Sequence, residues 1–172
     1  MNSPMMALAE IDGRLFEAVV LRRRPAMDLL MRFVTKLGNW YVIAPTTLAL
    51  SLGLITWLHE AGVQAAWSLA LSHAFVQLLK RRIARERPSL TVGRFFMIEP
   101  EDRFSFPSGH ATAGLSVALP LFLAIGGPLG LLILALGLCI GASRCYLGVH
   151  YPGDVAAGWF LAVATVSFVA AM

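Results

Sequence analysis

Four long stretches of this chain carry almost no charge, and this pattern limits the possible folds more than any other feature. With histidine neutral, Asp154 is the only charged side chain in the segments 37–58, 61–79, 104–143 and 145–172. A helix needs about 20 mostly apolar residues to cross the hydrocarbon core of a bilayer. Charged residues make up 14% of the chain, against about 25% in soluble domains. We therefore predict an all-α integral membrane protein.

The apolar stretches divide into about five membrane-spanning helices. The third stretch is about twice the length of one crossing, and Gly126-Gly127-Pro128 is a natural turn within it. The spans would form one bundle in a single domain over residues 1–172, with the transmembrane core at 38–172. We place them at about 40–59, 62–85, 108–125, 128–144 and 152–171.

The N-terminal segment 1–37 has a different pattern, in which apolar and charged residues alternate. Asp12, Arg14 and Glu17 interrupt the apolar residues, which argues against a cleavable signal peptide. We expect one or two amphipathic helices that lie in the membrane interface before the bundle begins. A soluble cap over the bundle is the alternative. The residues that could share the apolar face are Leu8, Ile11, Leu15, Phe16, Val19 and Val20.

The basic residues indicate how the bundle is oriented. With five spans, all 14 lysines and arginines fall before the first span or at span ends that share one side of the membrane. Lys80, Arg87 and Arg144 could serve catalysis and are therefore not counted, but the other basic residues all lie on this same side. Cytoplasmic loops carry an excess of lysine and arginine, so we place this side in the cytoplasm.

The loop 87–107 on the same side mixes aromatic residues such as Phe96 and Phe104 with charged residues. It could dip into the membrane interface and guide a lipid headgroup toward the bundle. It could equally be a connection whose aromatic residues pack on the helix ends. The sequence leaves both interpretations open.

Three clusters of polar residues lie at span ends on this side. The first contains Lys80 and Arg87, whose spacing of seven predicts that they share a helix face, followed by Pro88, which ends the helix. His73 and Gln77 continue the same stripe into the membrane. Taken alone, the cluster could simply be the basic flank of a membrane span.

The second cluster is Pro107-Ser108-Gly109-His110, at the start of the third span. Ser108 can cap the helix, and the exposed N–H groups of a helix start form an anion site. Gly109 lets an oxyanion approach the backbone closely, and His110 then stands at the rim. The alternative is an ordinary capped helix start with an incidental histidine.

The third cluster contains Arg144, His150 and Asp154. His150 and Asp154 are four residues apart at a helix start, so the carboxylate can reach one imidazole nitrogen and direct the other outward. An aspartate here could also do no more than favour the helix N-terminus. Ionisable residues at membrane depth nevertheless favour a functional site.

In order, the clusters read Lys-x6-Arg-Pro, Pro-Ser-Gly-His and Ser-Arg-x5-His-x3-Asp, from Lys80 to Asp154. This set resembles the three-part motif of the type 2 phosphatidic acid phosphatase superfamily, whose members are bundles of transmembrane helices. The resemblance implies a protein of the bacterial inner (cell) membrane. Many bacterial relatives have six spans, and here interfacial helices would replace the first. The soluble vanadium-dependent haloperoxidases of the superfamily do not fit so apolar a chain.

The resemblance also implies a role for each motif residue. His150 would attack phosphorus and form a phosphohistidine, Asp154 would orient it, and His110 would protonate the leaving alkoxide and then activate water. Because cations of the chain would hold the phosphate, no metal ion and no other cofactor is expected. The residues that would hold the non-bridging oxygens are Lys80, Arg87, Ser108, Gly109 and Arg144.

We therefore predict a membrane lipid phosphatase that hydrolyses a phosphomonoester or diphosphate of a lipid. Its partners would be the bilayer and a lipid phosphate of the phosphatidylglycerophosphate, phosphatidic acid or polyprenyl phosphate type, with no nucleic acid. The alternatives are a lipid phosphotransferase, a polyprenyl diphosphate phosphatase in carrier recycling, and a transporter or structural protein that binds anionic headgroups. Glu99, Glu101 and Asp102 could in principle bind a cation.

Overall fold

The computed structural model describes residues 4–88 and 96–172, and within them it contains seven α-helices and one short 3₁₀ helix. The predicted all-α fold is confirmed. Residues 89–95, part of the loop predicted at 87–107, lie outside the described residues, as do residues 1–3. The elements are α1 (Pro4–Val20), α2 (Pro25–Leu37), α3 (Trp40–Ser51), η1 (Thr56–Leu58), α4 (His59–Ile83), α6 (Gly109–Ile125), α7 (Gly127–Tyr146) and α8 (Pro152–Ala170).

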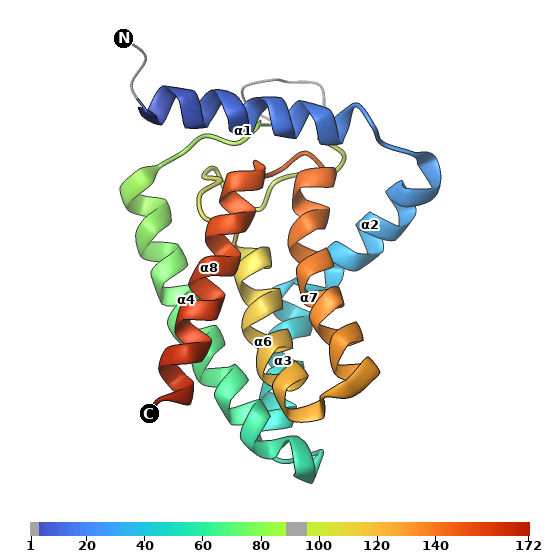
Figure 1. Cartoon of the computed structure of the whole chain (residues 1–172), viewed down its shortest axis with the longest axis vertical. Coiled ribbons are helices and arrows are strands. Elements are labelled where there is room, and N and C mark those ends of the chain that lie inside the picture. The colour runs from blue at the N-terminus through green and yellow to red at the C-terminus, as the bar shows by residue number, and fades with distance from the viewer. Residues whose placement is uncertain (1–3, 89–95) are drawn as a thin grey trace.

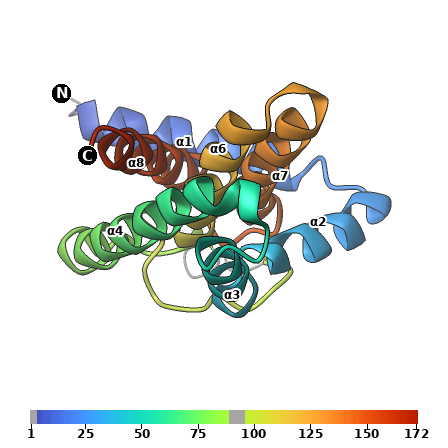
Figure 2. The ribbon, with the colours of Figure 1, turned by 90° about the horizontal axis from the view of Figure 1, so that it is seen from below.

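Helix α6 is the centre of the bundle and packs against α3, α4, α7 and α8 (Figure 1; Figure 2). Small residues allow the helices to approach closely. A Cβ atom added to Gly137 of α7 would lie 2.5 Å from the Cβ of Ala118 in α6, and one on Gly114 would lie 3.1 Å from Gly137 O. Every residue from 110 to 118 is buried as a result.

The outer faces of the bundle are apolar. Large hydrophobic side chains are exposed along α4, α7 and α8, and soluble proteins rarely expose contiguous apolar patches of this extent. Such a surface fits lipid as its solvent, so the protein is an integral membrane protein. Exposed examples are Trp67, Leu131, Leu132, Phe160 and Phe168.

The predicted count of five spans is not confirmed. Among the described helices, α7 and α8 are long and apolar enough to cross a membrane, whereas α6 is a shorter apolar helix. The predicted span at 40–59 is interrupted because α3 ends at Ser51 and Gly53 takes a positive φ of 81°. The 12 residues of α3 cover about 18 Å, against about 30 Å of hydrocarbon. The axis bends by 103° between α3 and the following η1–α4 segment.

Helix α1 lies across the end of the bundle at which α8 begins, while α2 packs beside α7 (Figure 1). Asp12, Phe16 and Val20 recur every four residues along α1 and are buried. Leu8 and Leu15 are exposed. Helix α1 is therefore a cap over the bundle end with an apolar outer edge, and its insertion into the membrane interface stays a prediction.

Candidate active site

The three predicted motifs meet at one end of the bundle, where α4 and α7 end and α6 and α8 begin (Figure 1). The backbone ties the second motif to the third, because Ser108 N–H donates to Asp154 O at 3.0 Å. Within the third motif, Arg144 O accepts from the N–H groups of Val149 and His150. Backbone hydrogen bonds thus hold two of the motifs in a fixed relation.

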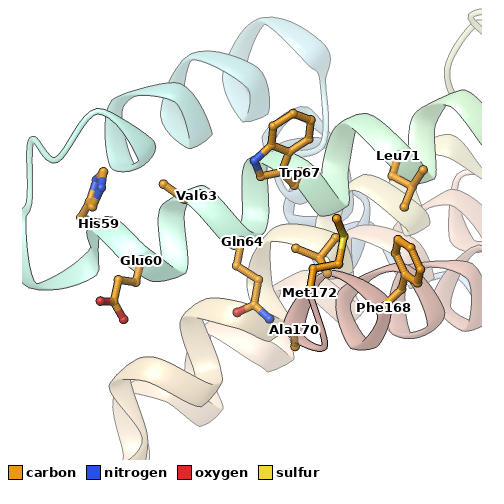
Figure 3. A pocket seen from close by; sticks show the side chains of 10 residues that line it. His59, Glu60, Val63, Gln64, Trp67, Leu71, Phe168, Ala170 and Met172 are labelled. Atoms are coloured by element: carbon orange, nitrogen blue, oxygen red, sulfur yellow. The ribbon is translucent and has the colours of Figure 1, made fainter.

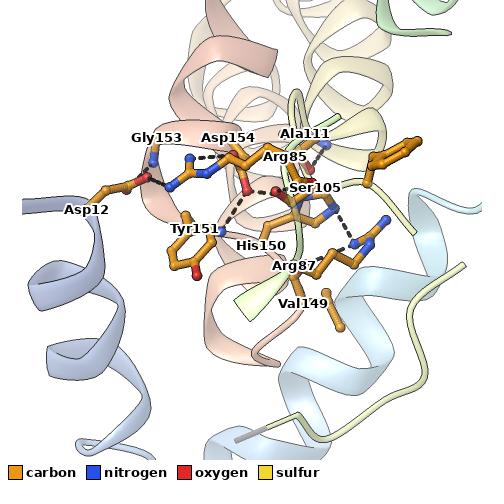
Figure 4. A network of polar contacts seen from close by, with 12 residues as sticks. Asp12, Arg85, Arg87, Ser105, Ala111, Val149, His150, Tyr151, Gly153 and Asp154 are labelled. Atoms are coloured by element: carbon orange, nitrogen blue, oxygen red, sulfur yellow. Dashed lines mark hydrogen bonds and ion pairs between the residues drawn. The ribbon is translucent and has the colours of Figure 1, made fainter. Parts of the chain in front are cut away.

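Arg87 reaches the interior through a turn that follows α4. The helix does not continue to Arg87 as the spacing predicted, because Ala84 adopts a left-handed backbone with a φ of 49° and ends it. Arg87 is nevertheless 1% exposed. Its guanidinium donates to Val149 O at 2.9 Å and to His150 Nε2 at 3.0 Å (Figure 4).

His150 lies between charges of opposite sign. An arginine can only donate, so Nε2 of the neutral ring accepts from Arg87 and the ring proton is on Nδ1. Nδ1 lies 3.6 Å from Oδ2 of Asp154, which is fully buried. Burial lowers the pKa of His150 well below its ordinary value, and the charges of Arg87 and Arg144 lower it further. His150 is therefore a neutral base whose Nε2 lone pair faces a cation.

Ser108 and His110 stand at the start of α6. Ser108 caps the helix, since its Oγ accepts from Ala111 N–H at 3.4 Å. The buried His110 donates through Nε2 to Asn39 Oδ1 at 2.8 Å, and the same nitrogen lies 3.3 Å from Glu101 Oε1. The capped helix start predicted from the sequence is therefore present, with its histidine held by neighbouring oxygens.

Arg144 and Lys80 add two further buried cations. Arg144 donates through Nη1 to Thr35 Oγ1 at 2.8 Å, and its Nη2 lies 3.6 Å from Glu101 Oε1. Lys80 lies in the last turn of α4 and donates to Asp102 Oδ2. Together with Arg87, these two side chains provide the positive charge that stabilises a phosphate.

Two carboxylates from the loop before α6 contact these cations. Asp102 binds Lys80 through one oxygen, and its other oxygen lies 2.8 Å from Arg87 Nη2. Burial raises the pKa of Asp102, but hydrogen bonds from Lys80 and Arg87 outweigh burial and hold the pKa below its ordinary value. The carboxylate of Glu101 likewise lies beside two motif side chains, those of Arg144 and His110. The loop therefore places two negative charges where an anion would bind.

The described part of the loop is hydrogen-bonded to the helix ends, but its aromatic residue Phe96 is exposed, so both sequence interpretations stay open. Met97 N–H donates to Leu147 O at 2.9 Å, and Ser105 N–H donates to Arg85 O at 2.8 Å. Two of its acidic residues, Glu101 and Asp102, pair with lysine or arginine. Within residues 4–88 and 96–172, no group of three histidine, cysteine, aspartate or glutamate side chains is placed to hold a metal ion.

Sequence reasoning missed several partners of the motif residues. Asn39 binds His110 across 71 positions, and Thr35 binds Arg144 across 109 positions. Arg85 binds the buried aspartate of the third motif at 2.8 Å. The spacing of residues along the chain predicts none of these three contacts. Arg85 also lies in a run of basic residues that is typical of the flank of a membrane span.

A cavity of about 750 Å³ leads from the side of the bundle to this cluster. Apolar residues of α3, α4 and α6 form most of its wall, and Lys80, Gly109 and His110 lie at its polar end. A second hollow, of about 840 Å³, lies between the start of α4 and the end of α8 and contains no motif residue (Figure 3). Of these two hollows among the described residues, the first joins an apolar wall to the motif residues.

Comparison with known sequences identifies the family. The sequence model of the PAP2 superfamily matches residues 61–172, which is more than half of the chain. This chain belongs to the PAP2 superfamily. The predicted resemblance is therefore confirmed.

Several relatives of this PAP2 chain are phosphatases. An undecaprenyl-diphosphatase of Sulfolobus acidocaldarius is 30% identical over 148 residues, which cover 86% of this chain and 71% of that protein. Phosphatidylglycerophosphatase B of Bacillus subtilis is 28% identical over 169 residues, covering 90% of this chain and 79% of the relative. The crystal structure of Aquifex aeolicus LpxE matches with a TM-score of 0.82 at 23% identity, over 94% of this chain and 96% of that one. The predicted activity class, a membrane hydrolase of lipid phosphate esters, is confirmed at the level of the family.

Proposed function

We propose that this PAP2 protein hydrolyses a lipid phosphate through a phosphohistidine at His150. One observation carries the proposal: His150 Nε2 lies 3.0 Å from Arg87 Nη1, while Nδ1 faces Asp154 Oδ2 at 3.6 Å. In an activated nucleophile, a neighbouring group orients the base, and fixed cations stabilise the group under attack. The geometry supports both parts of this arrangement.

In the first step, Arg87 moves its hydrogen bond from His150 Nε2 to a phosphate oxygen, and the freed Nε2 lone pair attacks phosphorus. An N–P bond forms, and the P–O bond to the lipid breaks. His110, after taking up a second ring proton when the anionic phosphate binds, gives that proton to the leaving oxygen. Asp154 stabilises the positive charge that the His150 ring acquires. In the second step, His110 takes a proton from water, the water oxygen attacks phosphorus, and the N–P bond breaks to release phosphate.

The basic side chains and the start of α6 would hold the phosphate during both steps. Phosphoryl transfer depends mainly on positioning and on charge stabilisation, so several fixed cations around one anion suit it. Glu101 and Asp102 contact the same cations, and a bound phosphate would displace them. The residues that would hold the non-bridging oxygens are Lys80, Arg87, Arg144, Ser108 and Gly109.

The lipid would enter from the bilayer through the cavity between α3, α4 and α6. Its apolar wall suits a hydrocarbon chain, and its polar end at Lys80 and His110 suits a phosphate. This route requires α3, α4, α6, α7 and α8 to lie in the membrane as five spans. The basic residues gather at the motif end, which supports a cytoplasmic orientation of the site in a bacterial inner membrane.

The substrate would be a lipid phosphomonoester or diphosphate. The names of the relatives point to undecaprenyl diphosphate and to phosphatidylglycerophosphate as the first candidates. A site on the cytoplasmic side favours a lipid made on the inner leaflet, such as phosphatidylglycerophosphate.

Phosphate release by the purified protein in detergent micelles tests the function. We expect release from at least one of phosphatidylglycerophosphate, phosphatidic acid and undecaprenyl diphosphate, and its loss in His150→Ala while the lipid still binds. His59→Ala is the matched control, because His59 lines the hollow at the opposite end of α4 (Figure 3). Full activity in His150→Ala, or no release from any of the three lipids, would contradict the proposal.

A further inference from the structure

We propose that Asp12 and Arg85 are positioning residues for the catalytic pair Asp154 and His150, which makes helix α1 part of the active-site machinery. The proposal rests on the hydrolysis proposed above, because the group that is positioned is the nucleophile. Neither is a fixed residue of the three motifs, since Arg85 takes one of the variable positions of Lys-x6-Arg-Pro. Asp12 also lies outside residues 61–172, which match the family.

Arg85 bridges two carboxylates from distant parts of the chain (Figure 4). Its Nη2 lies 2.7 Å from Asp12 Oδ2, and its Nη1 lies 2.8 Å from Asp154 Oδ1. The side chains of Arg85, Asp12 and Asp154 are 26%, 12% and 0% exposed, so salt screens them weakly. Burial lowers the pKa of Arg85, but the two carboxylates outweigh burial and raise the pKa above its ordinary value. The guanidinium therefore stays charged.

Asp12 is fixed to the start of α8 as well as to Arg85. Its Oδ1 accepts from Gly153 N–H at 2.7 Å, and a Cβ atom on Gly153 would lie 2.8 Å from Asp12 Oδ2. The Arg85 guanidinium lies over the Tyr151 ring at 4.1 Å from its centroid, and Phe16 of α1 packs edge-on against the same ring. Helix α1 therefore contacts the first turn of α8, where the catalytic aspartate lies.

The two oxygens of Asp154 have different partners. Oδ1 accepts from Arg85, whereas Oδ2 accepts from Tyr151 N–H at 2.9 Å and faces His150 Nδ1. Arg85, the Ser105 hydroxyl and the backbone together determine the plane of the carboxylate and the direction of Oδ2 (Figure 4). A fixed carboxylate in turn fixes the tautomer and the orientation of the imidazole.

Charge explains the need for Asp12. Arg85 alone would cancel the charge of Asp154, and the pair would offer no net charge to His150. With Asp12 included, the three groups carry one net negative charge. That charge is needed when the His150 ring becomes positive on attacking phosphorus, and the weakly polarisable interior strengthens its effect.

Asp12→Asn is the decisive variant, because it keeps the shape and the hydrogen bond from Gly153 but removes the charge. We expect kcat to fall about tenfold, as for one pKa unit of lost stabilisation, with KM within about twofold because Asp12 does not contact the phosphate site. Glu10→Gln is the matched control, since Glu10 lies on the same helix and pairs with the exposed Arg14. Asp12→Glu restores the charge and should recover part of the lost kcat.

A second measurement does not depend on turnover. The NMR shift of His150 Nδ1, assigned with His150→Ala, reports the carboxylate that faces this nitrogen. The other charged groups around the ring are unchanged in Asp12→Asn, so a shift seen in Asp12→Asn and absent in Glu10→Gln supports the proposal. Those groups are Asp154, Arg85, Arg87, Arg144, Lys80 and Asp102.

An unchanged kcat together with an unchanged Nδ1 shift in Asp12→Asn would overturn the proposal. A fall in kcat that matches a loss of thermal stability, leaves the Nδ1 shift unchanged and is not recovered by Asp12→Glu would overturn it as well, because a purely structural contact behaves in this way. If the wild-type protein releases no phosphate, the proposed hydrolysis fails on its own. The Nδ1 shift then still decides whether Asp12 positions the His150 ring.

Discussion

The Asp102 carboxylate lies 2.8 Å from Arg87 Nη2, and its other oxygen accepts a hydrogen bond from Lys80. Both cations are proposed to bind the phosphate of the substrate, so this phosphate has to displace a carboxylate of the protein itself. Buried charges are costly when they are unpaired. Asp102 therefore satisfies the cations and at the same time competes with the substrate for them.

We expect Asp102→Asn to bind vanadate, a mimic of five-coordinate phosphorus, about two- to fivefold more tightly than the wild type. The gain is small because Asp102 is half-exposed, and exposed ion pairs contribute about 0.2–1 kcal/mol. The affinity for vanadate is measured from its inhibition of phosphate release. Glu99→Gln is the control, since Glu99 is an exposed acid of the same loop. Weaker vanadate binding in Asp102→Asn would show that this carboxylate supports the phosphate site.

The low pKa of His150 determines the pH at which acidification removes activity. Only the neutral ring attacks phosphorus, and both burial and the neighbouring cations hold its pKa well below 6.5. Since kcat/KM reports the free enzyme, its value, corrected for ionisation of the substrate, should show no loss from protonation of His150 as the pH falls through 6.5. It should decline only well below that pH. A decline centred on pH 6.5 would mean that the His150 ring is not buried beside Arg87.

The basic side chains predict that activity does not need a metal ion. Lys80, Arg87 and Arg144 carry the positive charge that a divalent cation supplies in other phosphatases. We expect unchanged phosphate release after dialysis against a chelator, with a zinc-dependent phosphatase treated in parallel as the positive control. If activity disappeared with the chelator and returned with a divalent ion, the metal-free mechanism would be wrong.

The spacing of the motifs predicted which residues meet, because contacts along one helix or at one helix start follow from local geometry. His150 and Asp154 are an example, and the Ser108 cap of α6 is another. Lys80 and Arg87 do meet, but at the Asp102 carboxylate and after a turn at Ala84, whereas the sequence predicted a continuous helix.

The contacts that the sequence did not predict depend on how segments distant in the chain pack against one another. Asn39 contacts His110 and Asp12 contacts Arg85, both from the N-terminal region, and no local periodicity encodes those contacts. The count of five spans is not confirmed for a related reason. Hydropathy continues past Ser51, but the backbone turns at Gly53, and a charge-free stretch says nothing about such a turn.

The contact between α6 and α7 leads to a prediction about stability. A Cβ atom on Gly137 would lie 2.5 Å from the Cβ of Ala118, so Gly137→Ala has to push the two helices apart. We expect a loss of about 1–3 kcal/mol of unfolding free energy, as for other overpacked cores, seen as a lower thermal midpoint in detergent. Activity per folded molecule should remain, because Gly137 lies about two helical turns from Arg144.

Gly13→Ala is the matched control for this substitution. No atom lies within 4 Å of a Cβ added to Gly13, and alanine is favoured over glycine inside a helix by about 1 kcal/mol. Gly13→Ala should therefore unfold at or above the wild-type temperature, while Gly137→Ala unfolds below it. If both variants unfolded at the same temperature, α6 and α7 would have to pack less closely than the Gly137–Ala118 contact requires.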